Sequence, residues 1–205
     1  MATFPRQRPR PYARWLCRLC FSAWVACATL MAAGNATATD SIQITHAAPD
    51  ARGGQAYRMT YQVDLPLDVY WRFKTDFDNT FLEANPYILS HRLISRSGDT
   101  VVTENYYKSL PEVYFRWQTR IMAERHRLEF ELIATNQTGN RFHYGFIQLY
   151  ADNGRTRVVQ VARFDFWGAS FWSKYPWRGG MRSFLKDTAE WEREAAAAHA
   201  GKAHE

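Results

Sequence analysis

The chain has 205 residues and a formal net charge of +6, an excess that would favour a partner such as nucleic acid or anionic lipid. The excess is confined to residues 1–38, which hold five of the 26 basic side chains and no acidic one; 21 basic and 20 acidic side chains remain, a net charge of +1. All three cysteines, Cys17, Cys20 and Cys27, lie in the same segment. Residues 39–205 therefore have no thiol chemistry or disulfide, and too little positive charge for nucleic-acid binding.

Residues 1–38 have the three-part layout of a secretory signal peptide. An arginine- and proline-rich opening precedes an apolar run at 19–33, and Ala36-Thr37-Ala38 follows as a small-residue cleavage site. The run is shorter than the roughly 20 residues that span a bilayer. We expect cleavage near Ala38 and export across the inner membrane, to the periplasm if the source is Gram-negative. The alternatives are an uncleaved anchor and a lipoprotein attached at Cys27.

The remaining chain is long enough for one domain with a hydrophobic core. Residues 39–55, which end in Arg-Gly-Gly-Gln, are predicted to be a flexible leader, residues 56–198 the domain, and residues 199–205 a tail. Alternating apolar and polar residues at 57–64 predict a first strand. Pro66 then opens a helical stretch at 67–83 with a break at 76–79, which predicts two short helices.

A run of strands follows, joined by short links. The predicted spans are 87–95, 100–108, 113–122, 127–134, 141–150 and 155–166. The links carry turn residues, and Asp152-Asn153-Gly154 is a strong hairpin sequence. Each strand is therefore expected beside its sequence neighbour in an antiparallel meander.

Alternation also predicts a face for each side chain. One face of the third and fourth of these strands would hold Phe115, Trp117, Thr119, Ile121, Leu128, Phe130 and Leu132, and the other would hold Arg116, Gln118, Arg120, Arg127, Glu129 and Glu131. A sheet with one apolar face needs a cover. After Pro176, apolar residues spaced three or four apart predict an amphipathic helix of about 20 residues, with Arg182, Lys186, Asp187, Glu190 and Glu192 largely on its polar side.

Several residues fit a known pattern of strand, proline, short helix, Asp-Phe and proline. They are Pro66 to Trp71, Asp76 to Asn79, Pro86, and Gly179-Gly180-Met181 near the start of the last helix. With this order of elements, the chain resembles the START-like or SRPBCC superfamily of polyketide cyclases, coenzyme Q-binding proteins and lipid-transfer domains. The resemblance implies an α+β helix-grip fold, in which a curved antiparallel sheet of about seven strands wraps around a long C-terminal helix. It also implies a cavity between sheet and helix for an apolar small molecule or lipid.

Aromatic residues supply the candidate ligand contacts. The residues expected to line the cavity are Tyr61, Trp117, Phe130, Tyr144, Phe146, Phe164 and Phe184. Six large rings also occur between Phe166 and Trp177, where a loop should join the last strand to the long helix. We expect Trp167, Phe171 and Trp172 to gate the cavity mouth or to touch a membrane surface, or else to plug the end of the sheet.

Catalytic candidates are few. His143, Glu104 and Arg163 could polarise a carbonyl or move a proton if they pointed inward together. None of the six histidines has a metal-binding spacing, and no dinucleotide, phosphate-loop or nucleophile-elbow motif occurs. We therefore expect no metal and no cofactor.

Three functions remain open. The first is an exported carrier of a hydrophobic small molecule, lipid or isoprenoid, and the second is an enzyme of the polyketide cyclase or dehydrase type. Both predict an apolar cavity, but the enzyme also needs ionisable groups that converge inside it. The third is a non-catalytic module with a solid core that docks a protein through its aromatic loop.

Overall fold

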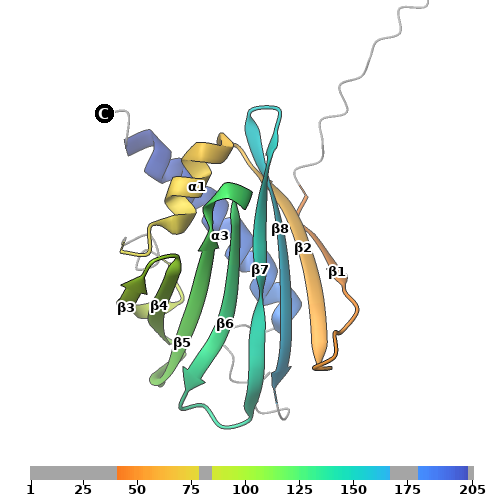
Figure 1. Cartoon of the computed structure of the whole chain (residues 1–205), viewed down its shortest axis with the longest axis vertical. Coiled ribbons are helices and arrows are strands. Elements are labelled where there is room, and N and C mark those ends of the chain that lie inside the picture. The colour runs from red at the N-terminus through yellow and green to blue at the C-terminus, as the bar shows by residue number, and fades with distance from the viewer. Residues whose placement is uncertain (1–40, 79–84, 167–179, 203–205) are drawn as a thin grey trace, which may run out of the picture. The chain divides into compact units, whose positions relative to one another are not determined.

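A computed structural model describes residues 41–78, 85–166 and 180–202. Its eight strands form one antiparallel sheet in the order β1-β2-β8-β7-β6-β5-β4-β3 (Figure 1). The strands are β1 (Gln43–His46), β2 (Gln55–Val63), β3 (Ile88–Ser97), β4 (Thr100–Tyr107), β5 (Leu110–Met122), β6 (Arg127–Thr135), β7 (Asn140–Asp152) and β8 (Arg155–Phe166). The predicted meander is confirmed from β3 to β8, since each of these strands pairs with its sequence neighbours.

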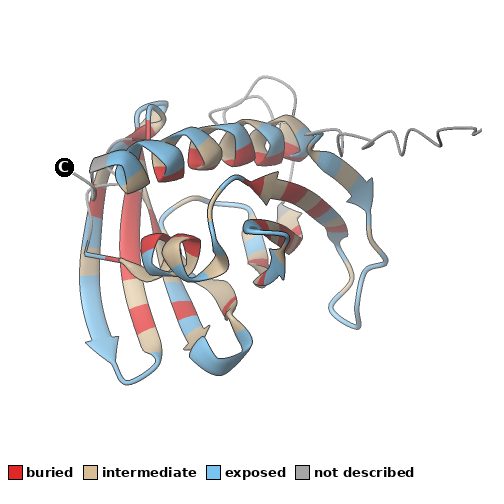
Figure 2. Ribbon diagram, turned by 90° about the horizontal axis from the view of Figure 1, so that it is seen from above, coloured by how far each residue is buried: buried red, intermediate tan, exposed pale blue. Residues whose placement is uncertain are grey.

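In the described ranges, two helices accompany the sheet, together with a short 3-10 turn, η1 (Ala123–Arg125), between β5 and β6. Helix α1 (Leu67–Thr75) follows Pro66, whose fixed φ suits a helix start, and it carries Asp68 in its first turn. Helix α3 (Gly180–Lys202) lies across one face of the sheet, with its buried residues toward the strands (Figure 2). The second short helix expected after β2 falls largely on residues 79–84, outside the described residues.

Local features of the strands explain their bends and turns. Register shifts interrupt the β3–β4 pairing and the β5–β6 pairing between Arg116 and Trp117, and such bulges bend a strand and increase its twist. The β7–β8 hairpin turns at Asn153 and Gly154, with φ of 50° and 79°. Both angles are those that an Asn-Gly hairpin turn requires, so the predicted hairpin is confirmed.

The predicted faces of β5 and β6 are confirmed by their register. Trp117 pairs with Leu132, Thr119 with Phe130, and Ile121 with Leu128. On the other face of the same two strands, Gln118 pairs with Glu131 and Arg120 pairs with Glu129. Strand residues that alternate in this way present one apolar and one polar surface, and the apolar surface of the sheet is the one that α3 covers.

The core lies between that surface and the two helices. Its fully buried side chains include Met59, Tyr70, Phe73, Phe115 and Phe164, each no more than 2% exposed. Helix α3 contributes a buried stripe with spacings of three and four, formed by Met181, Leu185, Ala189, Glu192 and Ala196. Glu192 is the exception to the predicted pattern, because it was expected on the polar side of the helix and is only 6% exposed.

The ends of the domain also differ from expectation. The segment 39–55, predicted as a flexible leader, contains β1, which pairs with β2 from Gln43–Thr60 to His46–Tyr57. Its Ile42 and Ile44 pack against the core, which gives the segment an apolar reason to be ordered. Helix α3 continues to Lys202, into the predicted tail 199–205. The proposed signal peptide, residues 1–38, lies outside the described residues. In the described ranges, neither helix combines the length and the hydropathy needed to cross a bilayer.

Candidate functional site

A pocket of about 210 Å³ lies between the covered face of the sheet and α3. We call it the central pocket. Its walls come from α1, from the inner face of β4 to β8 and from α3, and they are formed by Lys74, Phe77, Thr103, Asn105, Tyr107, Trp117, Thr119, Leu128, Phe130, His143, Ile147, Gln160, Phe184, Leu185 and Glu192. Eight of these fifteen side chains are apolar or aromatic and seven are polar or charged. The pocket therefore combines a hydrophobic lining with polar groups that can orient a small molecule.

Aromatic rings form the sheet-side wall. The His143 imidazole lies edge-on to the indole of Trp117 at 4.9 Å between centroids and to the ring of Phe130 at 6.0 Å. Phe130 lies opposite Gly145 in the β6–β7 ladder. A Cβ atom at Gly145 would stand 2.9 Å from Phe130 Cζ and 1.9 Å from the Val161 carbonyl oxygen. The missing side chain of Gly145 thus leaves room for the Phe130 ring at the pocket wall.

The pKa of His143 is lowered to about 3 because burial penalises the charged imidazolium. The side chain is therefore neutral at physiological pH. A neutral imidazole donates one hydrogen bond and accepts another, but it cannot serve as a strong acid near pH 7.

Two of the pocket residues, Lys74 and Glu192, belong to what we call the buried polar cluster, which also contains Tyr61 and Tyr70. The Lys74 ammonium donates a 2.6 Å hydrogen bond to Glu192 Oε1, and both side chains are less than a tenth exposed. The hydroxyls of Tyr61 and Tyr70 donate to Glu192 Oε2 at 2.8 and 3.1 Å. A buried ion pair needs such additional hydrogen bonds to offset the loss of hydration. The cluster ties β2, α1 and α3 together beside the pocket.

Two further residues of the pocket wall, Phe77 and Asn105, make polar contacts with His91. His91 Nε2 lies 3.1 Å from the Phe77 carbonyl oxygen, so this nitrogen donates, and Nδ1 lies 2.7 Å from Asn105 Oδ1. This link joins the chain after α1 to β4 at two residues that line the pocket. Burial raises the pKa of the neighbouring Tyr107 to about 12, so its phenol keeps its proton.

The structure divides the residues that were expected to contact ligand into three groups. Trp117, Phe130 and Phe184 line the central pocket. Tyr61 and Phe164 are buried in the core without lining it; Tyr61 belongs to the buried polar cluster, and the Phe164 ring lies 5.9 Å from that of His143.

Tyr144 and Phe146 form the third group and correct the prediction, because both lie on the opposite face of the sheet. The Tyr144 hydroxyl donates to Asp50 Oδ2, and the Arg127 guanidinium stacks on the Phe146 ring at 3.8 Å. Successive strand residues point to opposite faces. Since His143 faces the pocket, its neighbour Tyr144 must face away.

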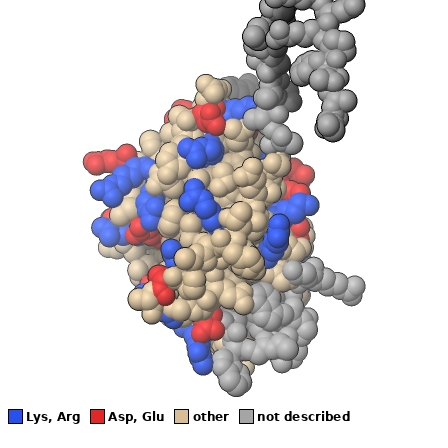
Figure 3. Space-filling model, turned by 90° about the vertical axis from the view of Figure 1, so that its right-hand side faces the viewer, with Lys and Arg blue, Asp and Glu red and all other residues tan. Residues whose placement is uncertain are grey.

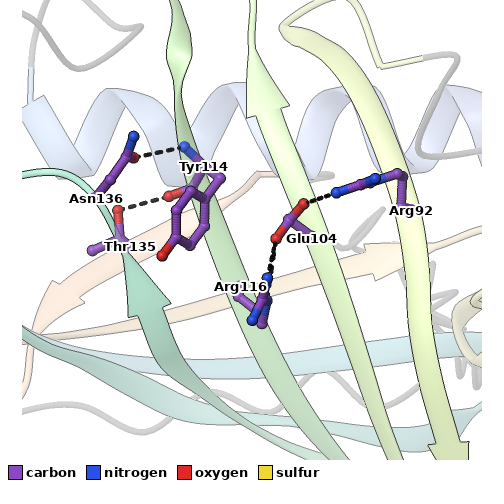
Figure 4. A network of polar contacts seen from close by, with 6 residues as sticks. All are labelled: Arg92, Glu104, Tyr114, Arg116, Thr135 and Asn136. Carbon is purple, nitrogen blue, oxygen red and sulfur yellow. Dashed lines mark hydrogen bonds and ion pairs between the residues drawn. The ribbon is translucent and has the colours of Figure 1, made fainter.

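The three catalytic candidates do not converge. Glu104 lies on the face of the sheet away from α3, where it bonds Arg92 and accepts two hydrogen bonds from Arg116, at 3.1 and 2.7 Å (Figure 4). These hydrogen bonds from Arg92 and Arg116 lower the pKa of Glu104, which keeps the carboxylate ionised. Arg163 also faces outward, with Nε 3.4 Å from Asp50 Oδ2. Only His143 lines the pocket, so the expected acid–base group is not assembled.

The uncovered face of the sheet carries other ion pairs as well, such as those of Arg52 with Glu131 and Arg141 with Asp165. The side of the molecule seen in Figure 3 carries scattered basic and acidic side chains on a largely uncharged surface. Within the part of the chain that the structure describes, no three histidine or acidic side chains gather as metal ligands would. The proposed gating residues Trp167, Phe171 and Trp172 lie outside the described residues.

Lys74 and Glu192 are the two charged pocket residues, and the sequence reasoning missed both of them. A signal was present for each, since Lys74 follows the buried Tyr70 by four residues and Glu192 follows Leu185 and Ala189 at helical spacing. Both therefore fall on the buried face of their helix. A charged residue at such a position is normally assigned to the surface, unless its partner is known.

No protein-family model matches the chain, and no curated protein matches its sequence. Solved structures do match. The Zhui aromatase/cyclase from Streptomyces superposes with a TM-score of 0.57 at 11% identity, covering 80% of this chain and 97% of that one. A START superfamily protein from Mycobacterium smegmatis gives 0.53 at 14% identity, covering 72% and 97%. The protein Ara h 8.0201 gives 0.54 at 14% identity with the same two coverages. The described domain therefore has the START-like helix-grip fold.

Proposed function

Since the domain shares the helix-grip fold of START-like proteins, we propose that it binds a hydrophobic small molecule or lipid in the central pocket. The observation that carries this proposal is the pocket itself, which lies between sheet and α3 and is walled by Trp117, Phe130 and Phe184. We further propose, from the layout of residues 1–38, that the protein acts after export as a carrier of such a molecule.

The size of the pocket limits the ligand. A cavity of about 150 Å³ holds one benzene ring, and ordinary ligand pockets begin at about 300 Å³. The 210 Å³ of the central pocket lies between these values. It suits a two-ring molecule or a short stretch of isoprenoid or acyl chain.

The positions of His143, Glu104 and Arg163 count against the acid–base group that was predicted for the cyclase or dehydrase alternative. A proton-transfer mechanism built on His143, Glu104 and Arg163 requires that they meet at one reacting centre. Glu104 and Arg163 lie on the other face of the sheet, and burial holds the pKa of His143 at about 3. The pocket in the described structure also counts against the third alternative, a module with a solid core.

Binding of naphthalene, an uncharged two-ring probe, tests the proposal. Trp117 lines the pocket, so its fluorescence should report binding directly. The variant Thr119→Phe adds a ring at a pocket-lining position that is 7% exposed. We expect it to weaken naphthalene binding at least about tenfold, because the added ring occupies part of the small volume.

The matched control is Gln118→Phe, which adds the same ring to the exposed face of the same strand. It should change the affinity less than about twofold. If both variants bind naphthalene as the parent does, the pocket is not the binding site. Native mass spectrometry of the protein purified from its own source would then show whether an apolar molecule is carried at all.

A further inference from the structure

The Lys74 ammonium is an unusual group to find in the wall of an apolar pocket. It has three protons to donate, and its side chain is only 7% exposed. Among the described residues, its hydrogen bond to Glu192 Oε1 at 2.6 Å is its single polar contact. Two N–H donors of a buried cation therefore have no acceptor among the described residues, and they lie beside the space of the central pocket.

The other members of the buried polar cluster are already occupied. Glu192 Oε1 accepts from Lys74, and Glu192 Oε2 accepts from both tyrosine hydroxyls. The protons of Tyr61 and Tyr70 are used in these bonds, and burial raises the pKa of both phenols well above their ordinary value. The donors left for a ligand in this cluster thus belong to Lys74.

The charge of the cluster selects the kind of acceptor. The ammonium and the carboxylate cancel, so the site is neutral overall. An anionic ligand would add an uncompensated negative charge in an apolar pocket next to Glu192, which is costly. An uncharged oxygen acceptor takes the hydrogen bond of the cation without adding a charge, and hydrogen bonds from charged donors are the stronger ones.

We propose that Lys74 determines the ligand specificity of the central pocket by binding a carbonyl or hydroxyl oxygen of an otherwise apolar, uncharged molecule. The proposal rests on the binding function proposed above and narrows it. The ligand class becomes a small ring ketone, quinone or phenol, or an isoprenoid or acyl chain that ends in an uncharged oxygen function, rather than a hydrocarbon or a carboxylate.

Three two-ring probes of similar size test the proposal: 1-tetralone carries a carbonyl, tetralin is its hydrocarbon counterpart, and 1-naphthoate carries a negative charge. Their affinities are measured by calorimetry for the full chain and for the double variant Lys74→Met/Glu192→Gln. That variant removes both charges together and keeps a carbonyl acceptor for the two tyrosines. The matched control is Lys186→Met/Glu190→Gln, which removes the exposed ion pair of α3, 58% and 48% exposed.

We expect the affinity of tetralone relative to tetralin to fall about tenfold in Lys74→Met/Glu192→Gln, the loss of one hydrogen bond from a charged donor. The control variant should leave this ratio unchanged, and the parent protein should bind 1-naphthoate at least about tenfold more weakly than tetralone. Circular dichroism and urea unfolding show whether the variant is folded, and the comparison of the three probes in the parent protein needs no variant.

Other outcomes separate the two proposals. If tetralone and tetralin bind but their ratio is the same in parent and double variant, Lys74 does not select the ligand, while the binding function stands. Equal binding of naphthoate and tetralone overturns the preference for an uncharged oxygen. If naphthalene binds but neither tetralone nor tetralin does, the proposed ligand class is wrong. If no probe binds, including naphthalene, both proposals fail.

Discussion

His143 shows how burial fixes the protonation state of a single side chain. It is 5% exposed and lies among the rings of Trp117, Phe130 and Phe164. Burial lowers its pKa from 6.5 to about 3. In the unfolded chain the ordinary pKa returns, so between these two values the unfolded state binds a proton that the folded state does not. Folding stability must therefore fall as the pH decreases from about 6.5.

The prediction is a loss of about 2 kcal/mol of unfolding free energy from His143 between about pH 7 and pH 5. Urea unfolding of the parent and of His143→Phe at both pH values measures this loss. Because the variant has no imidazole to protonate, its unfolding free energy should fall by about 2 kcal/mol less than that of the parent. His46→Gln, at an exposed histidine, is the control and should behave as the parent. Equal losses in the parent and in His143→Phe would show that His143 is protonated in the fold.

The opposite orientations of the neighbouring residues His143 and Tyr144 could have been predicted from the sequence. His143 and Tyr144 were both given pocket roles, although successive strand residues face opposite ways. Phe130, Trp117 and Phe184 were assigned correctly to the inner side, because β5, β6 and α3 have clear alternation or helical spacing. On β7 aromatic residues occur on both faces, Phe146 on one and His143 on the other, so hydrophobicity alone could not fix the phase of the strand.

Of the eight strands, β1 is the one that the sequence pattern did not predict. It has four residues, too few to show alternation against the polar segment around it. β1 is held at the edge of the sheet by its antiparallel pairing with residues 57–60 of β2. Ile44, opposite Met59, points to the core, and Thr45, opposite Arg58, points away.

Paired substitutions test whether β1 contributes to the core. Ile44→Asp should lower the unfolding free energy by about 2 kcal/mol, because a partly buried apolar side chain is replaced by a carboxylate. Thr45→Asp introduces the same residue one position along, on the exposed face, and should change it by no more than about 0.5 kcal/mol. Urea unfolding gives both values. Similar small effects would mean that β1 is only loosely attached.

The net positive charge of the chain is concentrated in residues 1–38, the segment that we propose directs export. The five arginines of residues 1–38 account for most of the formal charge of +6, while the described domain carries balanced ion pairs on its surface. If residues 1–38 are removed on export, the protein that remains is close to neutral. A near-neutral domain is expected to show little dependence on salt when it binds an uncharged ligand.

Cleavage of the proposed signal peptide, residues 1–38, can be measured directly. On expression in a Gram-negative host, the protein recovered from the periplasm should begin at Thr39 by intact mass. Ala38→Leu should block cleavage, because the peptidase site requires a small residue there. Thr37→Leu lies between the two small residues and should be processed as the parent is. Recovery of the parent chain with residues 1–38 still attached, in membranes or cytoplasm, would contradict the proposal.

The spans and faces of most strands, the hairpin at Asn153-Gly154 and the covering helix follow from local patterns, because periodicity and turn residues act over a few neighbouring positions. The polar contacts follow no local pattern. Lys74 and Glu192 are separated by 118 residues, and Glu104 is held by arginines of two neighbouring strands. Whether a charge is buried and paired depends on what the fold brings within a few ångströms of it. For that reason the family resemblance implied an apolar site, while the cation in its wall was visible only once α1 and α3 were packed together.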